Sequence, residues 1–407
     1  MSSTLAASAP GVRRGSNRRL CFTTVLLLVI ATVSWRRGVY YSGGVDPVVA
    51  GKAALSLIAL TMAWFARQAS PILIPVRGHS IAFLLSYLVV SVMGAHAAGQ
   101  LVPSAVLALR VLLVGMTLYF LARVFPREVL VRNLVRAMLL VAAISALTGL
   151  PSFGMNGRLF GGVPPLHANE LAFLLAVSLI GLTWLALNEG MKGHHVVLLF
   201  FGFGALWLTG SRTGLAAALL ALAVMLLQAR RLNRLVATAV VATIPLGFYL
   251  VFASELLDGY FLRGGADQVT TLSSRTIAWS AAWSFPETFW ARWTGMGLAQ
   301  KLIPVQDQWW DVQLLDSTWV SALVQVGLIG VVILLLWLVV VAVTSLRASR
   351  PARLFLVAAL ALLTVRSLLE SGMFDSTPSF LVIMLISLTG SAQQLPSRTS
   401  SESHVVE

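Results

Sequence analysis

A succession of apolar runs, each about twenty residues long, constrains this chain more than any other feature of its sequence. A helix needs about 20 apolar residues to cross the roughly 30 Å hydrocarbon core of a bilayer. Hydrophobic residues make up 58% of the 407 positions and charged residues only 11%, which is more apolar surface than a soluble core of this length can bury. The sequence therefore predicts an all-α, polytopic integral membrane protein.

Twelve runs are long enough to span a membrane, near 20–35, 48–66, 80–97, 104–125, 135–150, 169–188, 194–210, 212–228, 234–253, 318–345, 354–370 and 376–393. They divide the chain into a disordered tail (1–18), spans one to nine (19–253), one large external loop (254–317), spans ten to twelve (318–394) and a second disordered tail (395–407). Arginines precede the first run as in a signal peptide, but Trp35 and Arg36 follow it in place of a small-residue cleavage site. We therefore expect the first run to stay as a span.

Basic residues form short clusters between the apolar runs, which is typical of topology signals rather than of a nucleic-acid surface. With the N-terminus in the cytoplasm, most lysines and arginines lie in cytoplasmic segments. This distribution of basic residues over twelve spans predicts two cytoplasmic termini. It also explains the net charge of +14 without a nucleic-acid partner. The single cysteine, Cys21, excludes an intramolecular disulfide and a thiolate metal cluster.

The external loop, residues 254–317, is far longer than a connection between two helices requires. It holds nearly half of the acidic residues and half of the tryptophans. Aromatic rings beside mixed charges suit a polar ligand with flat apolar faces, such as a sugar; a belt of interfacial tryptophans is the alternative. Arg263, in the same loop, is a further candidate for substrate binding.

Two serine-arginine pairs stand at predicted helix starts. Ser211 is expected to cap the eighth span and Arg212 to lie in its first turn, where a helix N-terminus and a guanidinium together favour a phosphate. In the external loop, Ser274 and Arg275 repeat this arrangement, and Trp279 and Trp283 follow at four-residue spacing on the face of Arg275. The alternatives are an arginine that snorkels to the interface and a helix that lies on the headgroups.

Four further polar residues lie near the outer ends of predicted spans. Arg158 occupies an outer segment rich in glycine and proline that predicts an ordered re-entrant turn, and Asn169 is expected to cap the sixth span. Asp316 begins the tenth span, either as a helix cap or as a base that accepts a proton from a sugar hydroxyl. Glu370, like Asp375, lies near Arg366 at the outer end of the eleventh span, and both acids are expected to pair with the arginines and fix their geometry.

Other chemistries find little support in the sequence. Arg110 lies inside the fourth span and should face the bundle interior or a phosphate. The histidines show no zinc-binding spacing, and Asp307 and Asp311 alone offer acids four residues apart in the loop, so no metal is expected. P-loop and GxSxG motifs are absent from the sequence, which argues against nucleotide hydrolysis and a serine hydrolase.

Four segments, in this order, resemble the O-antigen ligase and polymerase superfamily of bacterial membrane glycosyltransferases: GRLFG…HANELA, TGSRTGL, RxxxW…GMG (Arg275, Trp279, Gly295, Gly297) and DSTWVSALVQVGLIG. The resemblance implies a GT-C-like, inverting and metal-independent enzyme without a cofactor. Its donor and acceptor would be undecaprenyl-diphosphate-linked glycans, and a chain-length regulator and a flippase would be its partners. Arg212 and Arg275, assisted by Arg158, would hold the diphosphate at the outer face of the bacterial cytoplasmic membrane.

The sequence departs from the ligases at one position. Those enzymes typically carry a His-Asn pair eleven residues before the first glycine of GLIG, where this chain has Asp316 and Ser317. The departure favours a polymerase that joins lipid-linked repeat units over a ligase that transfers glycan to a lipid or protein acceptor. A twelve-span secondary transporter is a rival from another class, but it should show repeated halves and interrupted helices, which the sequence does not reveal.

Overall fold

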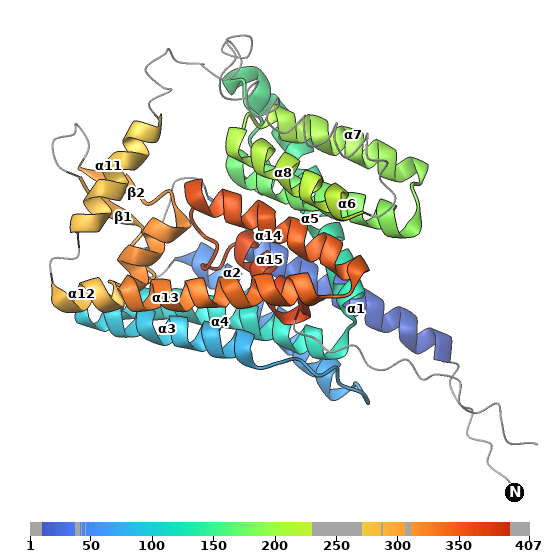
Figure 1. The fold of residues 1–407 in the computed structure, drawn as a ribbon, viewed down its shortest axis with the longest axis horizontal. Helices are drawn as coiled ribbons and strands as arrows, with labels where there is room; N and C mark the ends of the chain where they lie inside the picture. The colour runs from blue at the N-terminus through green and yellow to red at the C-terminus, as the bar shows by residue number, and fades with distance from the viewer. Residues whose placement is uncertain are drawn as a thin grey trace, which may run out of the picture.

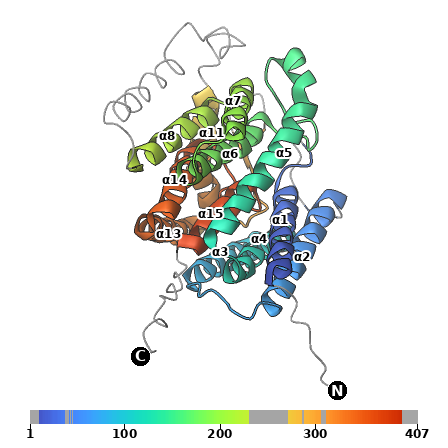
Figure 2. The same cartoon turned by 90° about the vertical axis from the view of Figure 1, so that its right-hand side faces the viewer.

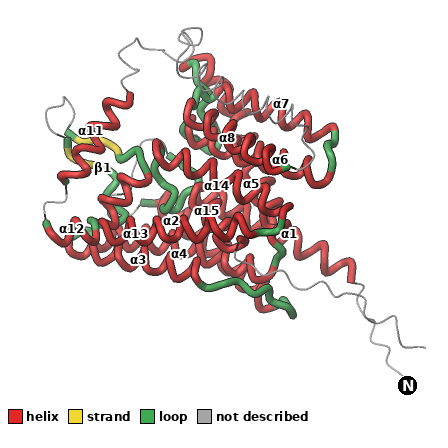
Figure 3. The backbone as a smooth tube through the Cα atoms, viewed as in Figure 1, coloured by secondary structure: helices red, strands yellow, loops and turns green. Residues whose placement is uncertain are grey.

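The computed structural model describes residues 10–36, 41, 43–44, 46–229, 271–285, 288–305 and 311–390. Figures 1 and 3 show that helices dominate these residues, with one small pair of strands. The all-α fold class is therefore confirmed. Among the described residues, seven helices are long and apolar enough to cross a membrane, and three shorter apolar helices accompany them.

Eleven of the twelve predicted spans coincide with helices, and the run 234–253 lies outside the described residues. The helices are α1 (Pro10–Thr32), α2 (Pro47–Gln68), α3 (His79–Ala97), α4 (Leu101–Val124), α5 (Arg127–Asn156), α6 (Ala168–Glu189), α7 (Gly193–Leu208), α8 (Arg212–Gln228), α13 (Thr318–Arg347), α14 (Arg350–Leu369) and α15 (Pro378–Gly390). The number of membrane crossings, twelve, stays a prediction.

Helices α6 and α15 form the centre of the bundle, as the position of α15 in Figure 2 illustrates. Sixteen of the 22 residues of α6 and 12 of the 13 residues of α15 are buried. Helix α14 packs against α8 and α6, while α15 contacts α4, α13 and α14. Helix α13 instead exposes an apolar stripe at three- to four-residue spacing, formed by Ile329, Val332, Leu335, Leu336 and Val339, as a lipid-facing helix should.

Arg110 confirms the expectation for a charged residue inside a span. Its side chain is buried in the middle of α4, and only 8% of the residue is exposed. The charges of Asp375 and Asp46 act on it favourably. Arg110 therefore faces the protein interior rather than lipid.

The described part of the external loop gathers at one end of the bundle (Figure 1). It contains α11 (Thr271–Ser284), α12 (Phe289–Thr294) and an antiparallel pair of short strands, β1 (Leu302–Pro304) and β2 (Val312–Leu314). Ala278 and Ala282 of α11 pack with Ile303 of β1 and Val324 of α13 in a small apolar cluster. The sequence did not predict the strands, because three-residue runs carry no clear alternation.

A break in α13 anchors the external loop to the bundle. Gly327 has φ 61° and ψ −168°, which interrupts the helix. The carbonyls of Val324 and Gln325 then accept hydrogen bonds from the backbone N–H groups of Met296 and Gly297, both at 2.9 Å. Gly327 packs closely against the loop, since an added Cβ would lie 2.4 Å from the carbonyl carbon of Trp293.

The same loop segment also binds α3 and α4. The backbone N–H of Leu298 donates to Ser91 Oγ at 3.1 Å, and that of Ala299 donates to Ser104 Oγ at 3.2 Å. Gly295 approaches α13 so closely, with φ 74°, that an added Cβ would lie 2.3 Å from the carbonyl carbon of Gln325. The GMG triplet thus serves as the joint where the loop enters the bundle.

The outer segment around Arg158 folds back along the end of α5, as a re-entrant turn should. Gly162 N–H donates to the carbonyl of Ser145 at 2.9 Å, and Ser145 Oγ donates to the carbonyl of Pro164 at 2.8 Å. On its other side, Leu159 N–H donates to the carbonyl of Leu208 at 2.8 Å. The turn therefore connects α5 with the end of α7.

We predict that Gly327→Ala destabilises the protein. A side chain at this backbone conformation costs about 1–3 kcal/mol, and the Cβ would also displace the loop at Trp293. The measurement is the melting temperature of the protein in detergent, followed by size-exclusion chromatography after heating. Gly204→Ala in α7 is the control, because its Cβ would meet nothing within 4 Å. Equal melting temperatures for both variants would contradict the anchoring role.

Candidate functional site

A cavity of about 500 Å³ lies where the ends of α1, α6, α13, α14 and α15 converge with the external loop. Its lining is unusually polar for the interior of a membrane protein. The charged members are Glu170, Lys301, Asp316, Arg366, Glu370 and Asp375, and His167, Asn169, Tyr87 and Gln325 add polar groups. Ionisable groups inside such a bundle are costly and mark functional sites.

One wall is a chain of hydrogen bonds that starts outside the cavity. Arg158 donates from Nε to the carbonyl of Thr209 at 3.0 Å and from a terminal nitrogen to Asn169 Oδ1 at 3.4 Å. Asn169 Nδ2 in turn donates to Glu370 Oε1 at 2.6 Å. Three predicted substrate-binding residues therefore meet in space, although 201 positions separate Asn169 from Glu370.

The predicted capping role of Asn169 is wrong. His167 is the N-cap of α6, and its Nδ1 accepts the backbone N–H of Asn169 at 3.3 Å. Asn169 lies one residue inside the helix, so its amide is available to bridge Arg158 and Glu370. Sequence alone did not distinguish the two, since asparagine is the commoner cap.

The α7–α8 turn brings two predicted arginines to one place. Ser211 caps α8 as predicted, with its Oγ accepting the N–H of Gly214 at 3.3 Å, and Arg212 opens the helix. Arg158 contacts the same turn through Thr209. Arg158 and Arg212 are absent from the cavity lining, so they flank it, and Asn169 forms the link.

Asp316 lines the cavity just before α13 begins. The N-cap of this helix is Ser317, although its side chain makes no capping hydrogen bond, so the capping alternative for Asp316 stays open. Thr318 then fixes the helix start, because its N–H and its hydroxyl both donate to the carbonyl of Glu370, at 3.1 and 2.8 Å. The start of α13 and the end of α14 are thereby held together, and the role of Asp316 as a base stays a prediction.

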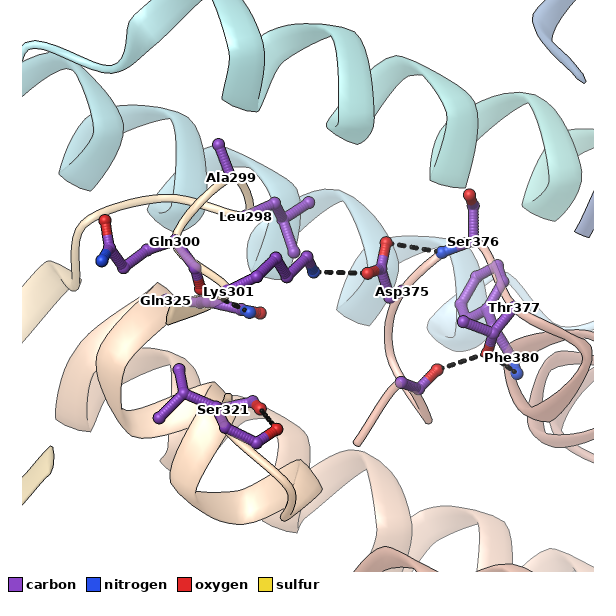
Figure 4. A network of polar contacts seen from close by, with 12 residues as sticks. Leu298, Ala299, Gln300, Lys301, Ser321, Gln325, Asp375, Ser376, Thr377 and Phe380 are labelled. Carbon is purple, nitrogen blue, oxygen red and sulfur yellow. Dashed lines mark hydrogen bonds and ion pairs between the residues drawn. The ribbon is translucent and has the colours of Figure 1, made fainter. Parts of the chain in front are cut away.

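A buried ion pair joins the external loop to the α14–α15 connection (Figure 4). Lys301 Nζ pairs with Asp375 Oδ2, and both side chains are less than one-fifth exposed. The backbone N–H of Ser376 donates to the other carboxylate oxygen at 2.8 Å. Burial alone would raise the pKa of Asp375, but Lys301, the Ser376 N–H and the charge of Arg110 outweigh it and hold this pKa below its ordinary value.

Sequence reasoning missed Glu170 and left Arg366 without a role of its own. Glu170 Oε1 accepts the backbone N–H of Ser34 at 2.9 Å, which ties the end of α1 to the start of α6. Arg366 hydrogen-bonds Ser379, and its guanidinium lies 4.5 Å from the ring centre of Phe173. A carboxylate within the HANELA motif at the start of an apolar span was the signal that could have identified Glu170.

The described tryptophans of the external loop, Trp279, Trp283, Trp290 and Trp293, are absent from the cavity lining. Helix α11 begins at or before Thr271, so Ser274 and Arg275 lie inside the helix and the predicted cap at Ser274 is wrong. Trp279 packs against the small apolar cluster, whereas Trp283 is 74% exposed. The side chain of Arg275 and all of Arg263 lie outside the described residues.

Both Glu370 and Asp375 were expected to pair with arginines. Asp375 pairs with a lysine instead, whereas Glu370 accepts from an asparagine that also contacts Arg158, and its pairing with an arginine stays a prediction. The charge of Glu370 does stabilise the Arg366 cation. Within the described ranges, no three His, Cys, Asp or Glu side chains lie close enough to hold a metal ion.

We predict that Asp375→Asn lowers stability and that the loss depends on pH in one direction. Removing one partner of a buried pair costs about 3–5 kcal/mol. Because the folded-state pKa of Asp375 is depressed, the wild-type advantage is complete above the unfolded-state pKa of about 3.9 and fades as pH falls through the folded-state pKa. Melting temperatures of both proteins should therefore differ equally at pH 8 and pH 5, and converge only in stronger acid.

Glu189→Gln is the matched control for this experiment. It breaks the ion pair of Glu189 with Arg132, whose side chains are 33% and 37% exposed. Exposed pairs contribute only about 0–1 kcal/mol. A loss in Asp375→Asn no larger than in this control, or one that varies between pH 5 and pH 8, would show that the buried pair is not the cause.

Comparison with known proteins agrees with the sequence resemblance. The sequence model of the O-antigen ligase family matches residues 197–335, a region that includes the α7–α8 turn, the GMG joint and the start of α13. No curated protein matches the chain. The match covers 139 of the 407 residues, and together with the multi-pass bundle it supports similarity to the O-antigen ligase and polymerase superfamily, that is, to O-antigen ligase-type membrane enzymes of glycan assembly.

Proposed function

We propose that this protein is a polymerase that joins polyprenyl-diphosphate-linked oligosaccharide repeat units into an envelope or exopolysaccharide. The observation that carries the proposal is the position of Asp316 in the wall of the polar cavity, where the family's ligases carry histidine. The protein would act at the outer face of the bacterial cytoplasmic membrane, with both termini in the cytoplasm. A flippase that supplies the repeat units and a chain-length regulator would be its partners.

The reaction is displacement at a sugar carbon. An acceptor hydroxyl attacks the anomeric carbon of the donor glycan, its proton passes to the Asp316 carboxylate, and the bond from that carbon to the diphosphate oxygen breaks with inversion. The electron pair stays on the departing polyprenyl diphosphate. Arg212 and Arg275, assisted by Arg158, are proposed to stabilise this growing negative charge, which lowers the transition state more than the ground state.

The chain Arg158–Asn169–Glu370 gives this proposal a geometric basis. It extends from the α7–α8 turn, where Arg212 begins its helix, into the cavity wall near the start of α13. A diphosphate held at the turn would leave its attached sugar in the cavity. Glu370 is then suited to bind sugar hydroxyls, and Trp279 and Trp283 of α11 to contact glycan further along the external loop.

A secondary transporter fits the structure less well, although α13 is an interrupted helix. In transporters the carbonyls freed by such a break coordinate ions. Here the N–H groups of Met296 and Gly297 occupy the freed carbonyls of Val324 and Gln325. The break therefore serves to hold the loop, and both freed carbonyls already accept a hydrogen bond from it.

We predict that Arg275→Ala abolishes polymer formation. Loss of one fixed donor to the leaving group costs about 10²–10³ in rate. The measurement is polysaccharide chain length in a deletion strain complemented with the variant, with membrane insertion verified by immunoblot. Arg292→Ala is the control, because Arg292 lies in α12 of the same loop. Wild-type chain lengths in Arg275→Ala would contradict the proposed role of Arg275 in stabilising the leaving group.

A second prediction concerns the base. Asp316→Asn keeps the shape of the side chain but cannot accept the hydroxyl proton, and loss of a general base costs about 10²–10⁴ in rate. With purified protein and lipid-linked repeat units, we expect lost turnover and retained donor binding. Asp316→His should retain part of the turnover, as histidine is an alternative base. Unchanged turnover in Asp316→Asn would remove the catalytic role.

A further inference from the structure

A second cavity, of about 530 Å³, lies between α1 and α5 at the far end of the bundle from the candidate site. From Arg18 to Thr32, which lines the first cavity, α1 covers about 21 Å at 1.5 Å per residue. The lining consists of Arg18, Arg19, Phe22, Thr23, Glu128, Val129, Arg132, Asn133 and Arg136. None of these residues has a role in the proposed reaction.

Helical spacing explains why the arginines face one another. Glu128, Arg132 and Arg136 are four residues apart and share one face of α5, while Arg18, Arg19 and Phe22 present the matching face of α1. The two helices pack against each other. The result is a cavity with guanidinium groups contributed from both sides.

The acidic residues near this cavity already form ion pairs with arginines. Glu128 pairs with Arg127 at 3.4 Å, and Glu189 pairs with Arg132. Arg18, Arg19 and Arg136 make no hydrogen bond or ion pair with any residue that the structure describes. All three arginines are exposed, so solvent screens their mutual repulsion. Together with Arg132 they nevertheless outnumber Glu128, the one acid of the lining, and the cavity therefore favours an anion.

The remaining lining distinguishes between kinds of anion. Phe22 and Val129 pack against the apolar core and offer a hydrophobic wall beside the guanidinium groups. The cavity also lies at the level of the bundle where helices leave the apolar region, since charged residues replace apolar ones here in both α1 and α5. A ligand that fits has phosphate at one end and hydrocarbon at the other.

We propose that this cavity binds the phosphate headgroup of an anionic phospholipid. The phosphate lies among Arg18, Arg19 and Arg136, and the first carbons of the lipid tails contact Phe22 and Val129. A headgroup with two phosphates matches three free cations better than one with a single phosphate. The bound lipid would fix α1 against α5 and so support, from the far end, the α1–α6 contact between Ser34 and Glu170.

The test is lipid binding by purified full-length protein, measured by native mass spectrometry. The probes are cardiolipin, phosphatidylglycerol and phosphatidylcholine added to delipidated protein. We expect the order cardiolipin, phosphatidylglycerol, phosphatidylcholine for wild type. Replacing two of the arginines in Arg19→Gln/Arg136→Gln should weaken cardiolipin binding by about 30-fold.

Arg77→Gln/Arg347→Gln is the matched control. It removes the same charge from two exposed arginines outside the cavity, so cardiolipin binding should stay within about twofold of wild type. A melting temperature equal to that of wild type in phosphatidylcholine would show that the cavity variant folds. Arg19→Lys/Arg136→Lys keeps the charge and provides a second, milder variant in case the first does not fold.

Three results would overturn the proposal. One is equal binding of all three lipids by wild type, which needs no variant at all. Another is equal loss of cardiolipin in the cavity and control variants, which would assign the effect to net charge. The third is competition by millimolar pyrophosphate that removes cardiolipin from wild type, since this would assign the site to a soluble phosphate compound.

Discussion

Two hydrogen bonds across the broken turn of α13 determine how the external loop and the helical bundle fit together. A carbonyl without a partner inside a membrane protein is costly, so the break at Gly327 is stable only because Met296 and Gly297 supply the missing donors. This contact fixes residues 295–301, and Lys301 at their end then reaches Asp375. The Lys301–Asp375 pair in turn fixes the connection between α14 and α15. The cavity therefore depends on a backbone interaction at its edge.

Charge balance inside the cavity follows from the same arrangement. Burying an ion is energetically unfavourable. A partner of opposite charge offsets this cost only when the other hydrogen-bonding positions of the ion are also satisfied. Asp375 meets this condition through Lys301 and Ser376, and Glu370 meets part of it through Asn169. These contacts hold the carboxylates in place before any substrate arrives. Such preorganisation is what an enzyme needs where charge develops during reaction.

Sequence patterns predicted those parts of the structure that depend on local physics. The lengths of the apolar runs predicted eleven of the helices, and the type and position of Ser211 predicted that it caps α8. The sequence could not predict contacts between residues far apart in the chain. No local pattern around Asn169 or Lys301 shows that their partners are Glu370 and Asp375. The sequence did not reveal the helix break at Gly327 for a related reason. A glycine in an apolar run is usually a packing contact, and only the approaching loop turns it into an interruption.

The arginines show why composition alone cannot separate a topology signal from a binding site. Positive charge near a helix end is enough to orient a span, whatever its neighbours are. At the outer end of the bundle, the described cations of the cavity each have an acid nearby, as Lys301 has Asp375 and Arg366 has Glu370. At the other end, Arg18, Arg19 and Arg136 converge from two helices, while the neighbouring acids pair with Arg127 and Arg132. A topology signal requires no such convergence, because scattered charges would orient the chain equally well and repel each other less.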